Sequence, residues 1–218
     1  MATKGRDKVS LSKDLWEENN DLARAALDHG FVRGLSDGTL PLASFQRYVA
    51  QDAFFLESFV RAYALALAHS PDREGLVEFA TLISGVMEEL GLHAGYAERW
   101  SVDLTRVEPT QATLAYTDFL LSTAALDGVG LTCAAMAPCM MLYAFLGRSL
   151  AEEGYAADNP YAEWIRTYSD PEFESLASKL ETLLDRYGGD GSLELSRAYR
   201  RAMSLEIGFF EASLTVAQ

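Results

Sequence analysis

Apolar residues recur along the chain at intervals of three and four positions, and runs in which β-branched residues alternate with polar ones are nearly absent. That spacing places side chains on one face of an α-helix, whereas strict alternation would predict strands. Ala and Leu are frequent among the apolar residues, and both favour helices. The pattern therefore predicts helices throughout the chain.

Caps and breaks divide this pattern into elements. Ser10 or Ser12 is a suitable cap for a first helix that runs to His29. Pro41 suits the first turn of a second, long helix that stops before Pro71. The other predicted helical stretches are two segments within residues 72–100 with possible breaks at Gly85, Gly91 and Gly95, a helix from Pro109 to Asp127, an apolar segment over 129–153 interrupted by Pro138, and helices over 161–168, 170–187 and 192–216.

The chain contains no internal repeat, no low-complexity tract and no linker that would divide it. We therefore predict that residues 1–218 form a single all-α domain, a bundle of roughly seven to nine helices. Residues 1–9 are expected to be a loose N-terminal extension.

Composition narrows the classes of function. With 18 Lys and Arg against 32 Asp and Glu, the net charge of −14 argues against binding to nucleic acid and against a transcriptional regulator. Two Cys and three His are too few for a disulfide framework and nearly too few for a zinc cluster. No apolar stretch of roughly 18 residues is free of polar breaks, and residues 1–14 resemble no secretory signal, so we expect a cytoplasmic protein that does not bind membranes.

Two acidic residues interrupt apolar helix faces. Asp52 falls on the stripe that includes Phe45 and Phe59, and Glu206 falls on the stripe that includes Tyr199 and Phe209. A buried carboxylate is costly unless it is paired or hydrogen-bonded. Two carboxyls in one apolar pocket can acquire different pKa values and act as acid and base, but each could equally be a structural group satisfied locally.

A thiol and several aromatic residues could belong to the same site. Cys139 follows Pro138, which tends to kink a helix, and Tyr143 lies one turn further on the same face. A cysteine in an apolar helix is more often a small buried residue, which is also the interpretation for Cys133. Tyr116, Tyr168 and the pair Phe54-Phe55 are core residues or, around two acids and a thiol, walls for a flat heteroaromatic ligand.

Glu89 and His93 have the i, i+4 spacing of a pair that could bind a metal. No second pair of this kind exists, because His29 and His69 lack matching partners. We therefore expect Glu89 and His93 to pack as a pair that joins two helices, and we expect no metal site.

These residues occur in an order and spacing that resembles the thiaminase II (TenA-type) family, whose fold is similar to that of haem oxygenase. The matching segments are Asp37-Gly38-Thr39-Leu40-Pro41, Gln51-Asp52, Glu89 with His93, Pro138-Cys139 with Tyr143, Trp164-Ile165 with Thr167-Tyr168, and Glu206. The resemblance extends from about Leu15 to Phe210.

The resemblance implies a hydrolase of thiamin salvage that deaminates 4-amino-5-aminomethyl-2-methylpyrimidine or cleaves thiamin, without a cofactor. It places the nucleophile at Cys139, the proton-transferring acid at Glu206 and the pyrimidine-binding carboxylate at Asp52. Ring contacts fall on Tyr116, Tyr143 and Tyr168, and Phe55 stands where the family often has Tyr. It also implies a homo-oligomer, a tetramer.

The carboxyls near Cys139 disfavour a thiolate, so we expect this residue to rest as a thiol and the substrate to supply most of the activation. Two other functions stay open. One is a non-catalytic pyrimidine-binding protein on the same fold, and the other is a metal-dependent oxygenase, which would contain stoichiometric iron.

Overall fold

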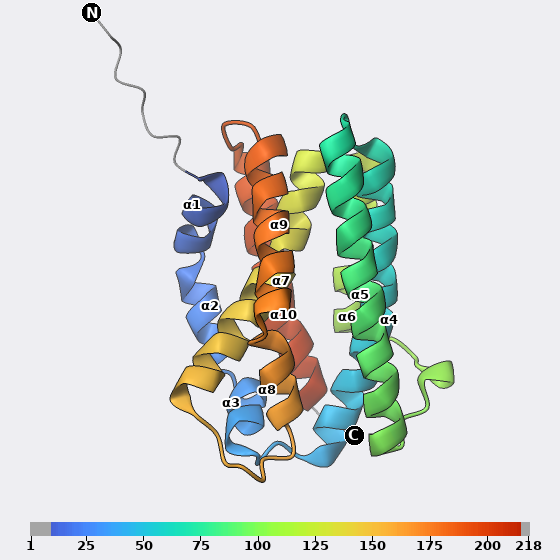
Figure 1. Cartoon of the computed structure of the whole chain (residues 1–218), viewed down its shortest axis with the longest axis vertical. Helices are drawn as coiled ribbons and strands as arrows, with labels where there is room; N and C mark the ends of the chain where they lie inside the picture. The colour runs from blue at the N-terminus through green and yellow to red at the C-terminus, as the bar shows by residue number, and fades with distance from the viewer. Residues whose placement is uncertain (1–9, 215–218) are drawn as a thin grey trace, which may run out of the picture.

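The computed structural model describes residues 10–214, and this part of the chain forms ten α-helices, one short 3₁₀ helix and no strand (Figure 1). The helices are α1 (Leu11–Glu18), α2 (Asn20–Leu27), α3 (Gly30–Asp37), α4 (Leu42–His69), α5 (Arg73–Trp100), η1 (Leu104–Arg106), α6 (Gln111–Leu126), α7 (Val129–Glu153), α8 (Ala162–Tyr168), α9 (Pro171–Tyr187) and α10 (Leu193–Leu214). The all-α prediction is confirmed. Residues 1–9 and the predicted end of the last helix at Val216 lie outside the described residues.

The predicted first helix is wrong in its extent, because three short helices occupy its place and the following turn. Ser10 caps α1 as predicted, but the chain turns at Asn19, whose side-chain amide donates to the Leu15 carbonyl. His29 caps α3, with its Nδ1 accepting from the amide of Phe31. The helix count consequently exceeds the predicted seven to nine.

The predicted break within residues 72–100 is also wrong, since α5 is one continuous helix. Its N-terminus is fixed by Asp72, which accepts a hydrogen bond from the Gly75 amide at 3.0 Å and from the Tyr187 hydroxyl at 2.8 Å. Gly91 and Gly95 lie in the helix interior with open space around them. Glycine lowers helix stability without ending the helix when the surrounding turns stay bonded.

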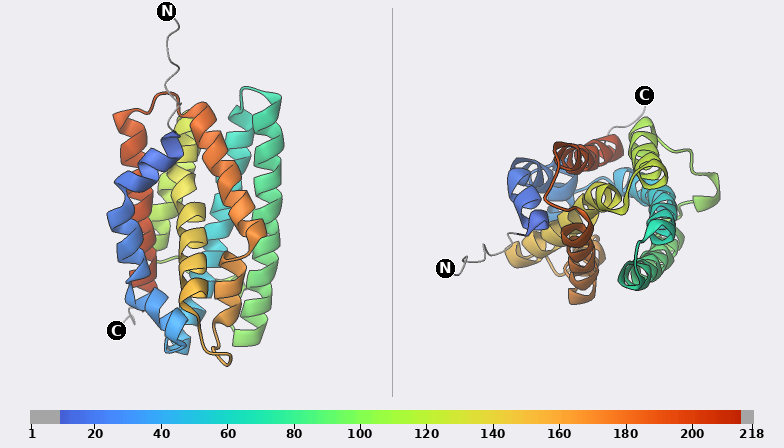
Figure 2. Two further views of the ribbon diagram at one scale, coloured as in Figure 1. Left: turned by 60° about the vertical axis from the view of Figure 1, so that its left-hand side comes forward. Right: turned by 90° about the horizontal axis from the view of Figure 1, so that it is seen from above.

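Helix α7 occupies the centre of the molecule. It packs against α9 and α10 along much of its length and against α6 and α8 as well. Seen from above in Figure 2, α7 is surrounded by α10, α9 and α4, while α4 and α5 run side by side at one edge. Residues from α4, α5, α7, α8 and α10 are thereby brought close together around one part of the core.

Contrary to the sequence-based prediction, α7 is long and apolar enough to cross a membrane by length and composition. Its most apolar window is 78% buried inside the protein, which is typical of a core helix. The helix continues unbroken through Pro138, and Cys139 follows on a buried turn.

Gly147 allows the end of α8 to lie directly on α7. A Cβ at this position would stand 2.3 Å from the Tyr168 carbonyl carbon and 2.5 Å from its oxygen, and backbone atoms cannot rotate away. We expect Gly147→Ala to lower the free energy of unfolding by about 3 kcal/mol. Gly95→Ala is the matched control and should raise it by about 1 kcal/mol, because the new methyl group meets open space. Denaturant unfolding checks both values, and an unchanged stability for Gly147→Ala would contradict this packing.

Candidate active site

A small cavity lies between α4, α5, α7, α8 and α9. Five of the seven predicted site residues line it: Asp52, Phe55, Cys139, Tyr143 and Tyr168. Glu89, Leu56, Phe59, Met140 and Phe173 complete the lining. The structure therefore brings residues from distant parts of the sequence around one apolar space with a few polar groups, the usual composition of a small-molecule site.

The other two predicted residues, Glu206 and Tyr116, lie behind the cavity wall. The Cys139 thiol lines the cavity and interacts with the Glu206 carboxyl. The Tyr116 hydroxyl donates to Oε1 of the same carboxyl at 2.7 Å. The three side chains come from α7, α10 and α6, and together they connect the cavity to the buried interior.

Burial determines the protonation states of Glu206 and Cys139. It raises the pKa of Glu206 to about 7, against the opposing effect of the hydrogen bond from Tyr116 and of the nearby Cys139 thiol. Burial, reinforced by the nearby Glu206, raises the pKa of the Cys139 thiol well above its usual range. This direction agrees with the expectation that Cys139 rests as a thiol. Near neutral pH, Glu206 is consequently able both to take up and to release a proton.

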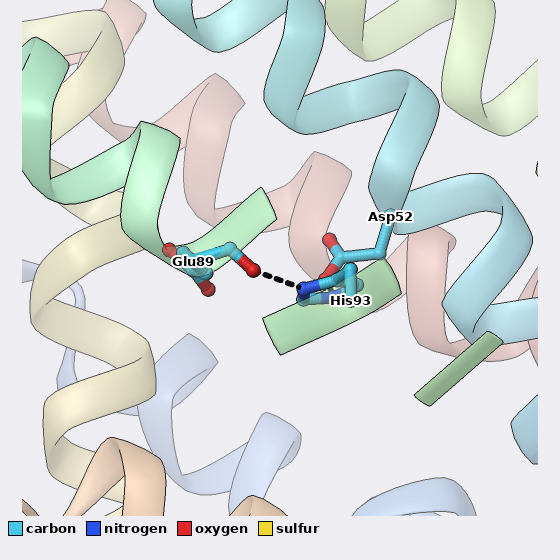
Figure 3. A group of neighbouring side chains, drawn as sticks. All are labelled: Asp52, Glu89 and His93. Atoms are coloured by element: carbon cyan, nitrogen blue, oxygen red, sulfur yellow. Dashed lines mark hydrogen bonds and ion pairs between the residues drawn. The ribbon is translucent and has the colours of Figure 1, made fainter. Parts of the chain in front are cut away.

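Asp52 is held by a histidine rather than by Glu206. His93 Nε2 lies 2.6 Å from Asp52 Oδ2, and His93 Nδ1 lies 3.0 Å from the Glu89 backbone carbonyl (Figure 3). Both side chains are almost fully buried. The expectation that the Glu89 and His93 side chains pack as a pair is therefore wrong, because His93 reaches from α5 to Asp52 on α4.

The Glu89 side chain points to a third helix. Its Oε1 accepts a hydrogen bond from the Tyr168 hydroxyl of α8 at 2.6 Å. Burial raises the pKa of Glu89 to about 7, opposed by the positive charge of His93. Three carboxyls thus surround this part of the core, and each has a different partner.

Aromatic rings form one wall of the cavity. The rings of Tyr143 and Tyr168 meet edge to face with centroids 4.7 Å apart. Behind them, the Tyr48 hydroxyl accepts from the Trp164 indole at 3.2 Å and donates to the Tyr143 hydroxyl at 3.4 Å. On another side, the Phe55 ring lies 4.8 Å from that of Tyr116. Rigid aromatic walls of this kind suit a flat ring.

A larger cleft of about 250 Å³, partly open to solvent, adjoins the cavity. Glu89, Met140 and Phe173 line both spaces. The outer cleft is otherwise bounded by α5 and by the start of α9. These three shared side chains therefore separate the inner cavity from the surface.

The ligand atoms of Asp52, Glu89 and His93 all lie within 4.8 Å of one another, which is compatible with a metal ion. The Glu89 carbonyl would orient the imidazole, as a hydrogen bond from the second ring nitrogen to a backbone carbonyl commonly orients metal-bound histidines. In the structure, however, Asp52 and His93 contact each other directly, so a metal would have to replace the proton between them.

Sequence reasoning missed the role of His93 and most of the apolar lining. The i, i+4 spacing marked Glu89 and His93 as chemically interesting, yet it gave no information on their partners in α4 and α8. Met140 and Phe173 carry no signal in the sequence, because apolar residues at helical spacing are ordinary core residues.

The model of the TENA/THI-4/PQQC family matches residues 16–215. The chain belongs to this family. The matched range includes every side chain of the cavity, and the resemblance noted in the sequence is thereby confirmed. The TENA/THI-4/PQQC chain is 33% identical over 182 residues to an aminopyrimidine aminohydrolase of Halalkalibacterium halodurans, and the match covers 81% of each protein.

Other relatives are longer. The chain is 32% identical to the mitochondrial bifunctional TH2 protein of Arabidopsis thaliana, but it spans only 37% of that protein's length, and it spans 28% of a thiamine biosynthesis multifunctional protein of Corynebacterium efficiens. A solved structure named as a TenA family transcription regulator, from Silicibacter sp. TM1040, is 31% identical, with a TM-score of 0.87 over 94% of this chain and 96% of the other.

The expected likeness to haem oxygenase is also confirmed. Haem oxygenase-1 of Synechocystis sp. PCC6803 superimposes with a TM-score of 0.62 over 94% of this chain and 92% of the other, at 16% identity. At this identity the likeness concerns the fold alone.

Proposed function

We propose that this TENA/THI-4/PQQC protein is a hydrolase of thiamin salvage that replaces the amine of an aminomethyl-pyrimidine by a hydroxyl group. The observation that carries the proposal is that Cys139, which lines a cavity with aromatic walls, interacts with the buried Glu206 carboxyl, to which Tyr116 donates a hydrogen bond. A thiol beside a carboxyl that titrates near neutral pH is suited to nucleophilic catalysis with proton transfer.

In the proposed complex the pyrimidine ring lies between the aromatic side chains, and Asp52 binds its polar edge. The Asp52 oxygen Oδ2 is bonded to His93, while Oδ1 makes no hydrogen bond with the described residues. Oδ1 can therefore accept from the 4-amino group of the ring. This contact draws the amidine-like edge into a fixed position, so that Cys139 faces a ring carbon.

The proposed reaction then follows from the protonation states of Cys139 and Glu206. The thiol proton passes to Glu206 as the sulfur forms a bond to the ring carbon, and the electron pair released in the ring expels the amine. Glu206 returns the proton to the departing amine. Water then adds as a hydroxyl group to the exocyclic carbon, the double bond of the ring re-forms as the sulfur–carbon bond breaks, and the proton released by the water passes through Glu206 back to the Cys139 sulfur. The balance is one aminomethyl-pyrimidine plus one water giving one hydroxymethyl-pyrimidine plus one ammonia, with no cofactor.

An assay of three substrates in parallel tests this proposal: the aminomethyl-pyrimidine, its formylamino derivative and thiamin. We expect ammonia release from the first. Slower cleavage of thiamin is expected, because Phe55 stands where the family often has a Tyr hydroxyl near the thiol. Tight binding of the pyrimidine with no product from any of the three would instead favour the non-catalytic binding protein.

We also propose that the protein is cytoplasmic and that it forms a homotetramer, the assembly that its resemblance to the thiaminase II family implies. Support for association comes from α5, which exposes several large apolar side chains, among them Val77 and Met87, each 55% exposed. Light scattering should give four chains per particle, and Met87→Glu should shift the mass to smaller species. Leu193→Glu is the control, because this exposed residue lies on α10. A monomeric wild type would contradict the proposal.

A further inference from the structure

His93 is the one described histidine that reaches the cavity residues, and the reaction proposed above assigns it no role. It is 2% exposed and lies on α5 with Tyr96, whose ring meets the imidazole edge to face. Its two nitrogens have different partners, the Glu89 carbonyl at Nδ1 and the Asp52 carboxyl at Nε2. An ordinary buried histidine needs hydrogen-bond partners for its ring nitrogens, and any polar group can supply them. His93 is bonded to Asp52, the carboxyl that faces the cavity.

The partners determine where the protons are. A backbone carbonyl has no hydrogen to donate, so His93 Nδ1 must carry the proton of that hydrogen bond. If the imidazole were neutral, Nε2 would be an acceptor and Asp52 would have to be protonated. If Nε2 also carries a proton, the pair is an imidazolium and a carboxylate at 2.6 Å.

The surrounding charges favour the second arrangement. Burial alone would lower the pKa of His93, but the charge of Asp52 and the hydrogen bond to it raise the pKa to about 9. The titratable groups that face the pair are Tyr48, Glu89, Tyr96, Cys139, Tyr143, Tyr168 and Glu206. Each is neutral or negative, so none of them competes with the imidazolium as a cation.

We propose that His93, as an imidazolium, is a positioning residue that holds Oδ2 of Asp52 and thereby directs the free oxygen, Oδ1, into the cavity as a hydrogen-bond acceptor for an N–H group of the ligand. The inference rests on the proposed role of Asp52. Without His93, Oδ2 would lose its hydrogen-bond partner, and Oδ1 would no longer be fixed toward the cavity.

This proposal explains why three nearby carboxyls can have separate tasks. The pKa values of Glu89 and Glu206 are both raised to about 7. Of the three carboxyls, Asp52 is the one that is hydrogen-bonded to His93. The site then offers one fixed acceptor for the ring and one carboxyl at Glu206 that exchanges protons.

Nitrogen-15 NMR of the ligand-free protein tests the protonation directly. We expect both ring nitrogens of His93 to be protonated at pH 7 and one to lose its proton only near pH 9. A ring that is neutral at pH 7 overturns the proposal. Because no substrate is present, this result is independent of whether the protein hydrolyses pyrimidines.

Binding of the hydroxymethyl-pyrimidine product to variants tests the consequence. We expect His93→Leu to raise Kd by about 10- to 100-fold, and His93→Gln to recover part of the loss, because its amide can still donate to Asp52. His69→Leu, at an exposed residue, should bind as the wild type does. Melting temperatures separate lost stability from lost affinity. Equal Kd values for folded His93→Leu and wild type, or for His93→Gln and His93→Leu, overturn the proposal.

If His93→Leu does not fold, the NMR result and the comparison of His93→Gln with wild type decide. In that case, a His93 ring that is neutral at pH 7 in the wild type overturns the proposal, and so does a Kd for His93→Gln equal to that of the wild type. Failure of wild-type protein to bind any pyrimidine would instead refute the proposed function, while leaving the hydrogen-bonded His93–Asp52 pair in place.

Discussion

Replacing Cys139 by Ala is expected to lower kcat for ammonia release by at least about 10³-fold, because no other group can form the bond to the ring carbon. The pyrimidine product should bind with a Kd within about threefold of the wild type, since its ring contacts and Asp52 are unchanged. Steady-state kinetics and calorimetric titration measure the two quantities. A variant that keeps wild-type turnover would exclude Cys139 as the nucleophile.

Cys133 provides the matched control for this experiment. It lies on the same helix, is fully buried, and burial raises the pKa of its thiol. It does not line the cavity. Cys133→Ala should therefore keep its activity, and an equal loss in the two variants would indicate damage to α7 rather than to catalysis.

Replacing Glu206 by Gln is expected to lower kcat/KM by about 10²- to 10⁴-fold, the usual range for a proton-transferring group. The substitution keeps the volume of the side chain, and the Tyr116 hydroxyl can still donate to the amide oxygen. The variant can no longer take the thiol proton. Glu194→Gln, at an exposed position of the same helix, is the control and should be fully active.

The pH dependence of the same two proteins identifies the group. Burial raises the pKa of Glu206 to about 7, and only the carboxylate can accept the thiol proton. Activity of the wild type should therefore be low below pH 7 and rise as pH increases through about 7. The pKa of Glu89 is also raised to about 7. If the rise of activity through pH 7 persists in Glu206→Gln, the titrating group is therefore Glu89.

Much of the fold followed from the sequence because each helix carries its own signal. The pattern of apolar residues predicted α4, α6 and α9, and Ser10 was a correct cap. The pattern gave wrong helix boundaries at two positions: it continued the first helix through Asn19, and it allowed a break at Gly95. Asn19 ends α1 through a bond to the Leu15 carbonyl. Gly95 only weakens a helix that tertiary packing holds together.

The candidate site was predictable where a residue broke a pattern. Asp52 and Glu206 stood out because they are acids on apolar faces, and Cys139 because it follows a proline. Their partners could not be predicted. The contact of His93 with Asp52 joins residues 41 positions apart, and the hydrogen bond from Tyr116 to Glu206 joins residues 90 positions apart. Such distances are set by how α4, α5, α6 and α10 pack.

The outer cleft could not be predicted either. Its lining includes Phe173 of α9, Met140 of α7 and Glu89 of α5, and none of these residues forms a motif with the others. The position of α9 relative to α7 results in part from the close approach at Gly130, where a Cβ would stand 2.2 Å from the Tyr187 carbonyl oxygen.

The most direct test of the proposed hydrolysis is a turnover of the aminomethyl-pyrimidine in water enriched with oxygen-18, followed by mass spectrometry and ammonia determination. The proposed reaction predicts one hydroxymethyl-pyrimidine carrying one oxygen-18 atom for each ammonia released, over many turnovers per chain. Recovery of the unchanged aminomethyl-pyrimidine, bound at one molecule per chain with no ammonia formed, would contradict it.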